Sequence, residues 1–260
     1  KKAFSGAELS VKAGMADKGD AENQDLSLTL GGEFDKGNVV VNLSYGNTSA
    51  VRQSDRIACS KYGTEEGTFE CFGSSTSEGG RALLADGTQV QFNQDPDTAT
   101  NGNNYSPYNG ALHSFNYIPY LNAVSPMERI NLSSFANYNI NDSVQLFVEA
   151  SYANRQGEQI VTPRNGFAGI KVDADFQYNP TGQDLEFLRR RNTELGAPYF
   201  FQETNTIRIV TGLTGVLDNG WEWDLSYNYG RNTGTDGWTF DIDPDRAAHT
   251  LDDSICTYDN

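Results

Sequence analysis

The sequence predicts an all-β fold: part of an antiparallel transmembrane β-barrel, with about seven strands and long extracellular loops. Two patterns carry this prediction. Apolar and polar residues alternate with a period of two in seven separate segments, as they do along strands that have two different faces. Short and long connections between these segments alternate strictly, which is typical of outer-membrane barrels.

The alternating segments span seven to eleven residues and predict strands of about 9–11 residues each, the length with which a tilted strand crosses a bilayer. In chain order they cover residues 7–15, 26–34, 39–45, 130–140, 144–152, 207–213 and 221–229. Seven is an odd number, whereas bacterial single-chain barrels have an even number of strands. We therefore expect the chain to be an incomplete barrel that ends in a surface loop.

Aromatic residues favour a membrane face over a sandwich core. Trp221, Trp223, Tyr227 and Tyr229 share one face, and we expect them near the strand ends. The tyrosines at 45, 138 and 152 follow the same pattern. Amphipathic rings at the headgroup level form the girdles of membrane barrels. The alternative is a tyrosine-rich sandwich core, since aromatic residues are common in strands.

The connections separate into two kinds. Residues 35–38, 141–143 and 218–220 are rich in Asn, Asp and Gly, which tolerate the positive φ of tight hairpin turns, and we expect them on the periplasmic side. Longer connections cover residues 17–25, 50–128, 154–205 and 230–260, and the last three are predicted to be large surface loops. A soluble β-sandwich usually has more even spacing between its turns.

Composition limits the possible functions of the 260-residue chain. It carries 19 Lys and Arg against 35 Asp and Glu, a formal net charge of -16, which argues against binding to nucleic acid. No window approaches the roughly 20 consecutive apolar residues that a membrane-spanning helix requires. Membrane-spanning strands alternate apolar and polar residues and do not require such a run. The chain begins Lys1-Lys2 with no signal sequence, so we expect either a processed protein or an internal piece.

The three cysteines predict one disulfide. Cys59 and Cys71 lie in the same Gly/Ser/Thr-rich stretch, and a bond between them suits an extracytoplasmic compartment. Cys256 lies close to the end, where its partner can lie beyond the chain. The alternative is three free thiols.

No catalytic constellation is visible, so we expect no enzyme, cofactor or metal. His113 and His249 lie far apart, whereas a nucleophile, a base and an orienting group must converge. Asp241, Asp243 and Asp245 have the spacing that opens a calcium loop. The glycine required at the sixth position is Arg246 and the glutamate required at the twelfth is absent, so a solvated acidic loop is the preferred interpretation.

Two groups are candidates for ligand binding. Rings in the first long loop could stack on a sugar or grip a peptide, or could pack the loop against itself: Tyr105, Tyr108, Phe115, Tyr117 and Tyr120. The run Arg189, Arg190 and Arg191 could meet an anionic ligand, an acidic plug surface or lipopolysaccharide phosphate. The plainer interpretation of the run is a loop ion-pair cluster with Glu186 and Glu194.

Several segments resemble the TonB-dependent receptors, which import siderophores, cobalamin, sugars and peptides across the outer membrane. The opening KKAFSGAELSVKAG resembles the passage from the plug domain into the first barrel strand. GNVVVNLSYGNTSAVRQSDR resembles the third strand and its exit into a loop. Two further stretches resemble loop ends with the hairpins that follow them: FNYIPYLNAVSPMERINLSSFANYNINDSVQLFVEASYANRQ and FLRRRNTELGAPYFFQETNTIRIVTGLTGVLDNGWEWDLSYNYG. Together these segments cover about half of the chain.

The resemblance implies a location in the bacterial outer membrane and a set of partners. These are membrane lipid and lipopolysaccharide, the receptor's own plug and remaining barrel strands, TonB, and a small-molecule, sugar or peptide ligand. The plug, the TonB box and the later barrel strands are not in this sequence, so transport would belong to the parent protein. Two other classes remain open: a secreted or surface carbohydrate-binding adhesin built as a β-sandwich, and a passive porin or structural barrel.

Overall fold

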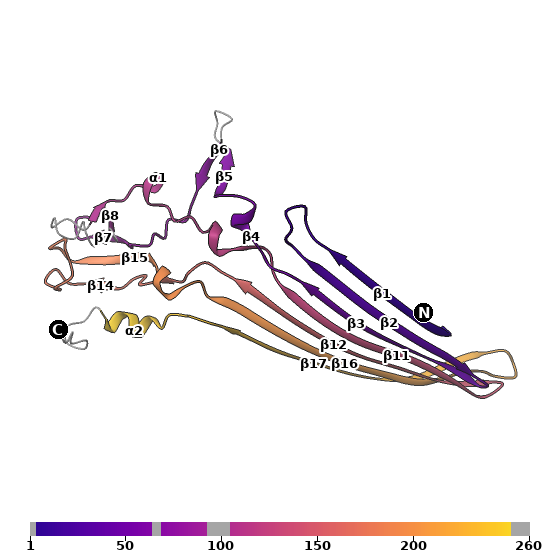
Figure 1. Ribbon diagram of the computed structural model, residues 1–260. Helices are drawn as coiled ribbons and strands as arrows, with labels where there is room; N and C mark the ends of the chain where they lie inside the picture. Colours follow the sequence, from indigo (N-terminus) through magenta and orange to yellow (C-terminus); the bar gives the residue numbers. More distant parts are fainter. Residues whose placement is uncertain (1–3, 64–68, 93–104, 251–260) are drawn as a thin grey trace. The chain divides into compact units, whose positions relative to one another are not determined.

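The computed structural model describes residues 4–63, 69–92 and 105–250 and confirms that the protein is all-β with large antiparallel sheets (Figure 1). Two compact units share the chain. The first comprises residues 1–51, 124–159 and 200–237, and the second comprises residues 52–123, 160–199 and 238–260. The chain passes between them repeatedly, so each unit is built from three separate segments.

The first unit is one sheet of long strands. Its order follows the chain: β1 (Gly6–Gly14), β2 (Asn23–Phe34), β3 (Gly37–Thr48), β11 (Met127–Asn141), β12 (Val144–Ile160), β16 (Tyr199–Val216) and β17 (Glu222–Trp238). From β1 to β12, each strand pairs with its neighbour in an antiparallel register. The seven strands predicted from alternation are therefore confirmed in number and order among the described residues.

The predicted strand lengths are wrong for the later strands. β11 has 15 residues, β12 and β17 have 17 each, and β16 has 18. Backbone hydrogen bonds continue after the side-chain alternation ends, because a ladder does not require an apolar face. Tyr152, Tyr227 and Tyr229 consequently lie inside β12 and β17, and their predicted position near the strand ends is wrong.

The three tight turns are confirmed. Two residues separate β2 from β3 and two separate β11 from β12. Asn141 Oδ1 accepts a hydrogen bond of 2.9 Å from the backbone N–H of Ser143. In the turn between β16 and β17, Gly220 has a φ of 82°, a conformation that side chains with a Cβ rarely adopt. These turns return the chain directly to the neighbouring strand.

The sheet is open in the part of the chain that the structure describes. β1 pairs with β2 on one side, and β17 pairs with β16 on one side. Both outer strands therefore present backbone donors and acceptors along one edge, which is a template for pairing with a further strand.

The second unit contains short strands in regions that the sequence predicted to be surface loops. β13 (Asn165–Gly166), β15 (Leu185–Arg191), β7 (Arg81–Leu84), β8 (Gln89–Phe92) and β9 (Tyr105–Pro107) pair in that order, and β14 (Lys171–Val172) pairs with β15. β5 (Ser60–Gly63) pairs with β6 (Phe69–Phe72), and β4 (Val51–Arg52) pairs with β10 (Asn122–Val124).

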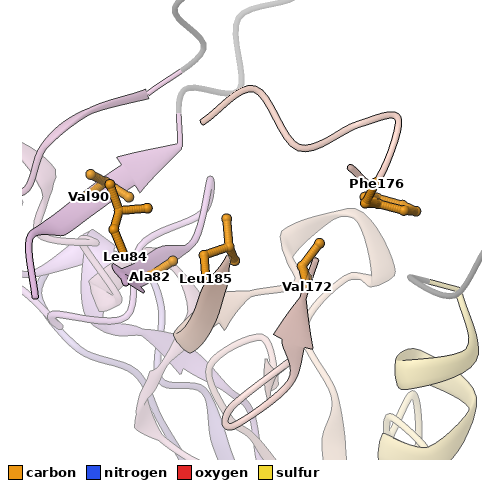
Figure 2. Packing of buried hydrophobic residues seen from close by; sticks show 6 residues of the cluster. All are labelled: Ala82, Leu84, Val90, Val172, Phe176 and Leu185. Carbon is orange, nitrogen blue, oxygen red and sulfur yellow. The ribbon is translucent and has the colours of Figure 1, made fainter. Parts of the chain in front are cut away.

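This unit has a small apolar core of its own. Residues from four strands, β7, β8, β14 and β15, and from the segment after β14 converge in it (Figure 2): Ala82, Leu84, Val90, Val172, Phe176 and Leu185. Phe92, Tyr105 and Phe187 pack against this cluster from the side. β15 meets β7 through the pairs Leu185–Leu84 and Phe187–Ala82, which joins the two long loop segments. The two long loops are therefore held together by a core of their own.

Helices are short. α1 (Gly110–His113) and α2 (Pro244–His249) are single turns or little more, and 3₁₀ turns cover Gln53–Asp55, Ile118–Tyr120 and Thr193–Leu195. Among the described residues, no helix is both long and apolar enough to cross a membrane.

Candidate functional site

The long sheet has an apolar face that the described chain does not cover. Residues paired across neighbouring strands share a face, and on this face they form five rows: Phe34–Gly37–Tyr138–Leu146, Gly32–Val39–Ala136–Val148, Ala7–Leu30–Val41–Ser134–Ala150, Leu9–Leu28–Leu43–Leu132–Tyr152 and Val11–Leu26–Tyr45–Ile130–Asn154. Side chains of these rows are strongly exposed, with Leu9 at 65% and Leu43 at 48%. A contiguous apolar surface of this kind marks a site of contact with another apolar phase or partner.

An aromatic pair closes this face at the turn end. The rings of Phe34 and Tyr138 stack with centroids 6.4 Å apart and an angle of 24° between the planes. Gly37 lies between them in the same row. The two rings cover this glycine, which has no side chain to contribute to the row.

The opposite face is mostly polar, with a few apolar side chains such as buried Val40, and it is cross-linked by side-chain hydrogen bonds. Asn42 Nδ2 donates to Ser27 Oγ and to Thr29 Oγ1, each at 2.9 Å, and so bridges β3 to β2. On the other side of β3, Asn131 Nδ2 donates to Ser44 Oγ at 3.3 Å. These bonds tie β2, β3 and β11 together without an apolar layer. In antiparallel sheets a polar face of this kind commonly contacts water.

Ion pairs extend the polar face. Arg129 on β11 reaches over Gly46 on β3 to Asp25 on β2, with 3.4 Å between Nη2 and Oδ1. Arg208 lies 3.7 Å from Glu149. A hollow of about 470 Å³ opens on this face beside Asn42 and Glu149. All four charged side chains are at least 30% exposed, so each pair contributes little to stability.

The predicted ligand-binding tyrosines all make packing contacts in the second unit. Tyr105 packs against the core cluster and lies 6.4 Å from Phe92, centroid to centroid. Tyr117 donates a 2.9 Å hydrogen bond from its hydroxyl to Ser60 Oγ. Tyr120 lies 5.3 Å from the ring of buried Phe115. These contacts are those of rings that pack the loop against itself, the second of the two predicted roles, and ligand binding by them stays a prediction.

Tyr108 has a different neighbour. The guanidinium of Arg81 lies over its ring, 4.0 Å from the centroid, which is the geometry of a cation–π contact. The same Arg81 also donates from Nε to Gln89 Oε1 at 3.1 Å. Tyr108 is thus anchored to the β7–β8 hairpin while its ring stays half-buried.

The arginine run divides into three roles. Arg189 is exposed and donates to Ser75 Oγ at 3.1 Å. Arg190 pairs with Glu194, with 2.5 Å between Nη1 and Oε1, as the ion-pair interpretation predicted for that glutamate. Burial raises the pKa of Glu194, but hydrogen bonds from its own backbone, Arg190 and Asn192 and the Arg190 charge outweigh it, so the net pKa is lowered. Of the three arginines, Arg189 has the most accessible charge.

Arg191 is a buried structural residue. It is 8% exposed, and its Nη1 donates to the backbone oxygen of Pro163 at 2.6 Å while its Nη2 donates to Ser74 Oγ at 3.0 Å. Its guanidinium also lies 5.3 Å from the ring centroid of Phe115. Burial lowers the pKa of this guanidinium from its usual very high value. Arg191 therefore joins three segments of the second unit that are distant in sequence.

The predicted disulfide is present. Cys59 and Cys71 are bonded, with 5.6 Å between their Cα atoms, and the bond closes the β5–β6 hairpin next to the Lys61–Cys71 pair. Cys256 lies outside the described residues.

A charged aromatic cluster was missed by the sequence analysis. Arg164 lies over the Trp238 ring, 4.4 Å from its centroid, and its Nε lies 3.0 Å from Asp241 Oδ1. Arg164 Nη2 donates a hydrogen bond of 3.2 Å to Asp241 Oδ2, which strengthens the ion pair. Nothing in the spacing of these residues signals the contact, because Arg164 is distant in sequence from the other two.

The acidic motif near the end of the chain caps a helix. Asp243 is the N-cap of α2, and its side chain accepts from the backbone N–H groups of Asp245 and Arg246. Asp241 is held by Arg164. Within the described ranges, no group of His, Cys, Asp and Glu has the arrangement of a metal site. His113 Nδ1 accepts a hydrogen bond from the backbone N–H of Asn109, the N-cap residue of α1.

Comparison of the chain with protein family models, with curated proteins and with solved structures gave no match.

Proposed function

We propose that this chain is part of a TonB-dependent receptor of the bacterial outer membrane. In this proposal the long sheet forms part of the wall of a transmembrane β-barrel. The segments of the second unit are extracellular loops that capture a ligand for energised uptake. The protein has no enzymatic role.

The observation that carries the proposal is the height and continuity of the apolar face. Its five rows run from Tyr138 to Ile130 along β11, a distance of about 26 Å at about 3.3 Å per residue. A strand tilt of about 40° reduces this height to about 20 Å, and the side chains of the outer rows add several ångströms. The result is comparable with the apolar band of outer-membrane barrels, roughly 25 Å tall.

The polar face and the two open edges of the sheet suggest the other partners of the chain. The polar face would line the barrel interior and meet the receptor's plug domain. The open edges of β1 and β17 would pair with the remaining barrel strands. Lipid and lipopolysaccharide would surround the apolar face, and TonB would act through the plug side of the parent protein. The resemblance leaves the ligand open among small molecules, sugars and peptides.

Labelling of two neighbouring positions tests the membrane assignment. Leu225, 67% exposed on the apolar parity of β17, and Ser226, on the opposite parity, are each replaced by cysteine in the full-length protein. We expect a lipid-soluble reagent to label Leu225→Cys and an aqueous reagent to label Ser226→Cys. Equal aqueous labelling at both positions contradicts the membrane assignment. Protection of Leu225→Cys from both reagents favours the alternative, a secreted adhesin whose second protein layer covers the apolar face.

The receptor class is tested separately by reading the encoding gene upstream of this chain. A plug domain behind a signal sequence supports a TonB-dependent receptor. A complete barrel without a plug supports a passive porin instead.

A further inference from the structure

We infer that the polar face of the long sheet carries a binding site for a small organic anion. Arg129 on β11 and Arg155 on β12 hold the acid group of the ligand, and Met127 and Phe200 contact its apolar part. All four residues belong to the first unit. The inference rests on the proposed function and adds to it the chemical class of the ligand.

The two arginines are direct cross-strand partners. Arg129 pairs with Arg155 in the antiparallel register of β11 and β12, so both side chains lie on the same face of the sheet. Like charges directly opposite one another destabilise a sheet. An anion bound between the two guanidinium groups converts this repulsion into two attractions. The pairing of two arginines therefore points to a negatively charged ligand.

The row of paired residues that contains these arginines has an excess of positive charge. Across five neighbouring strands it reads Lys12–Asp25–Gly46–Arg129–Arg155. Its one carboxylate, on Asp25, lies 3.4 Å from Arg129 Nη2. The whole chain has 35 acidic and 19 basic residues, so a row with three cations and one anion runs against its composition.

Arg155 has no carboxylate partner among the described residues. Its Nε donates to Met127 Sδ at 3.2 Å, and a thioether sulfur is a weak acceptor. The planar fork of its guanidinium is therefore available for a carboxylate, which it binds with two parallel hydrogen bonds. Arg208 is different, because it lies 3.7 Å from Glu149 on the same face of the sheet.

Hollows beside the two arginines provide room for a ligand. Arg155 lines a hollow of about 170 Å³ together with Met127, Phe200 and Gln202. Arg129 lines a second hollow, of about 330 Å³, together with Lys12 and Asp25. Small-ligand sites combine apolar walls with a few polar groups that fix the orientation. A thioether and a ring beside a guanidinium therefore suit an organic anion with an apolar part better than bare phosphate.

Glu158 also borders the first hollow. It lies three positions after Arg155 on β12, so its side chain belongs to the opposite face of the sheet. It does not neutralise the arginine pair in the register that the structure shows.

Ligand-observed NMR tests the site with matched probes. Saturation-transfer titrations use the full-length protein in detergent with phenylpropanoate, which has an acid group and an apolar ring. Phenylpropanamide is its neutral analogue, and propanoate is the acid without the ring. Three variants are compared with the parent protein: Arg129→Gln, Arg155→Gln and Arg208→Gln. The last is the matched control, because it removes an arginine that already has an acidic partner.

We expect phenylpropanoate to bind the parent protein and Arg208→Gln equally well. It should bind Arg129→Gln and Arg155→Gln at least about tenfold more weakly, because each loses charge-assisted hydrogen bonds. Phenylpropanamide and propanoate should bind the parent more weakly than phenylpropanoate. Equal weakening in all three variants shows a diffuse attraction of charge and overturns the inference. Equal binding of any two probes also overturns it, as does a parent protein that does not bind phenylpropanoate because a carboxylate of its own plug fills the site.

Thermal unfolding without ligand separates a binding role from a structural one. Arg155→Gln removes the repulsion from Arg129, so its midpoint should equal that of the parent protein or exceed it. A lower midpoint together with lost binding identifies a structural arginine and overturns the inference. The proposed function is checked separately by labelling Leu225→Cys in vesicles. Labelling by the lipid-soluble reagent without phenylpropanoate binding sinks this inference alone, whereas aqueous labelling equal to that of Ser226→Cys contradicts the proposed function.

Discussion

Replacing two neighbouring serines by arginine tests which face of the sheet contacts lipid, because the two substitutions should change the free energy of unfolding by different amounts. Ser134 lies in the third of the five apolar rows, and Ser133 lies on the polar face beside it. An arginine on the lipid face costs about 2–4 kcal/mol near the middle of the bilayer and about 0–1 kcal/mol near its edges. We therefore expect Ser134→Arg to lower the free energy of unfolding by about 3 kcal/mol, roughly a hundredfold in the folding equilibrium. Ser133→Arg should change it much less, because that side chain lies on the polar face, which would line the barrel interior and not the lipid.

Equilibrium unfolding in urea measures both values. The full-length protein and the two variants are unfolded and refolded in phosphatidylcholine vesicles, and the free energy is extrapolated to water. Because the two substitutions have the same starting and final residues, differences in propensity and side-chain size cancel. Equal unfolding free energies for the two variants refute the reasoning, since the Ser134 face would then not contact an apolar phase. A larger penalty at Ser133 would show that the faces are assigned the wrong way round.

Three further predictions concern local contacts. Replacing Cys59 and Cys71 by serine should cost the hairpin they close roughly 3 kcal/mol in the chain-entropy model, measurable by hydrogen exchange in the β5–β6 hairpin; unchanged exchange contradicts it. In Gly46→Ala the new Cβ would approach the carboxylate of the crossing ion pair to 2.9 Å, so we expect a loss of up to about 1 kcal/mol, whereas Gly32→Ala, with no atom within 4 Å, should be neutral or stabilising. The lowered pKa of Glu194 means that its contribution to stability is present above the pKa of the unfolded chain and is lost as pH falls through the folded pKa. Glu194→Gln should remove that part of the pH profile of the unfolding free energy, and identical profiles would contradict this.

The long sheet could be predicted from the sequence because its signal is local. On β11, alternation from Ile130 to Ile140 identifies a strand with two different faces, and the Asn141–Ser143 turn identifies its partner. Sequential strands joined by tight turns must be neighbours, so the order follows as well. The boundaries could not be predicted in the same way. Beyond Gln156 on β12 both faces are polar, and the backbone ladder leaves no pattern in the side chains.

The second unit could not be predicted because its contacts join residues that are distant in sequence. β7 and β15 have only a few residues each, and their pairing through Leu84 and Leu185 joins the two long loops. The four residues of β7 are too few to show a clear period, and the seven residues of β15 do not alternate between apolar and polar side chains. The burial of Arg191 could not be predicted from the sequence for a related reason. Its hydrogen-bond acceptors, at Ser74 and Pro163, lie in segments that are distant in sequence. A run of arginines in a sequence looks the same whether the charges are exposed or buried.

The two units depend on different sources of stability. The long sheet is a single layer with an exposed apolar face, so its folding depends on what covers that face and on strands that pair with its edges. The second unit has its own buried cluster around Val90, a disulfide at Cys59 and a buried arginine at position 191. Surface residues of the second unit, such as Arg189, can therefore change without disturbing the rows of the wall. In the proposed receptor, this separation would let ligand specificity change in the loops while the residues of the apolar face stay the same.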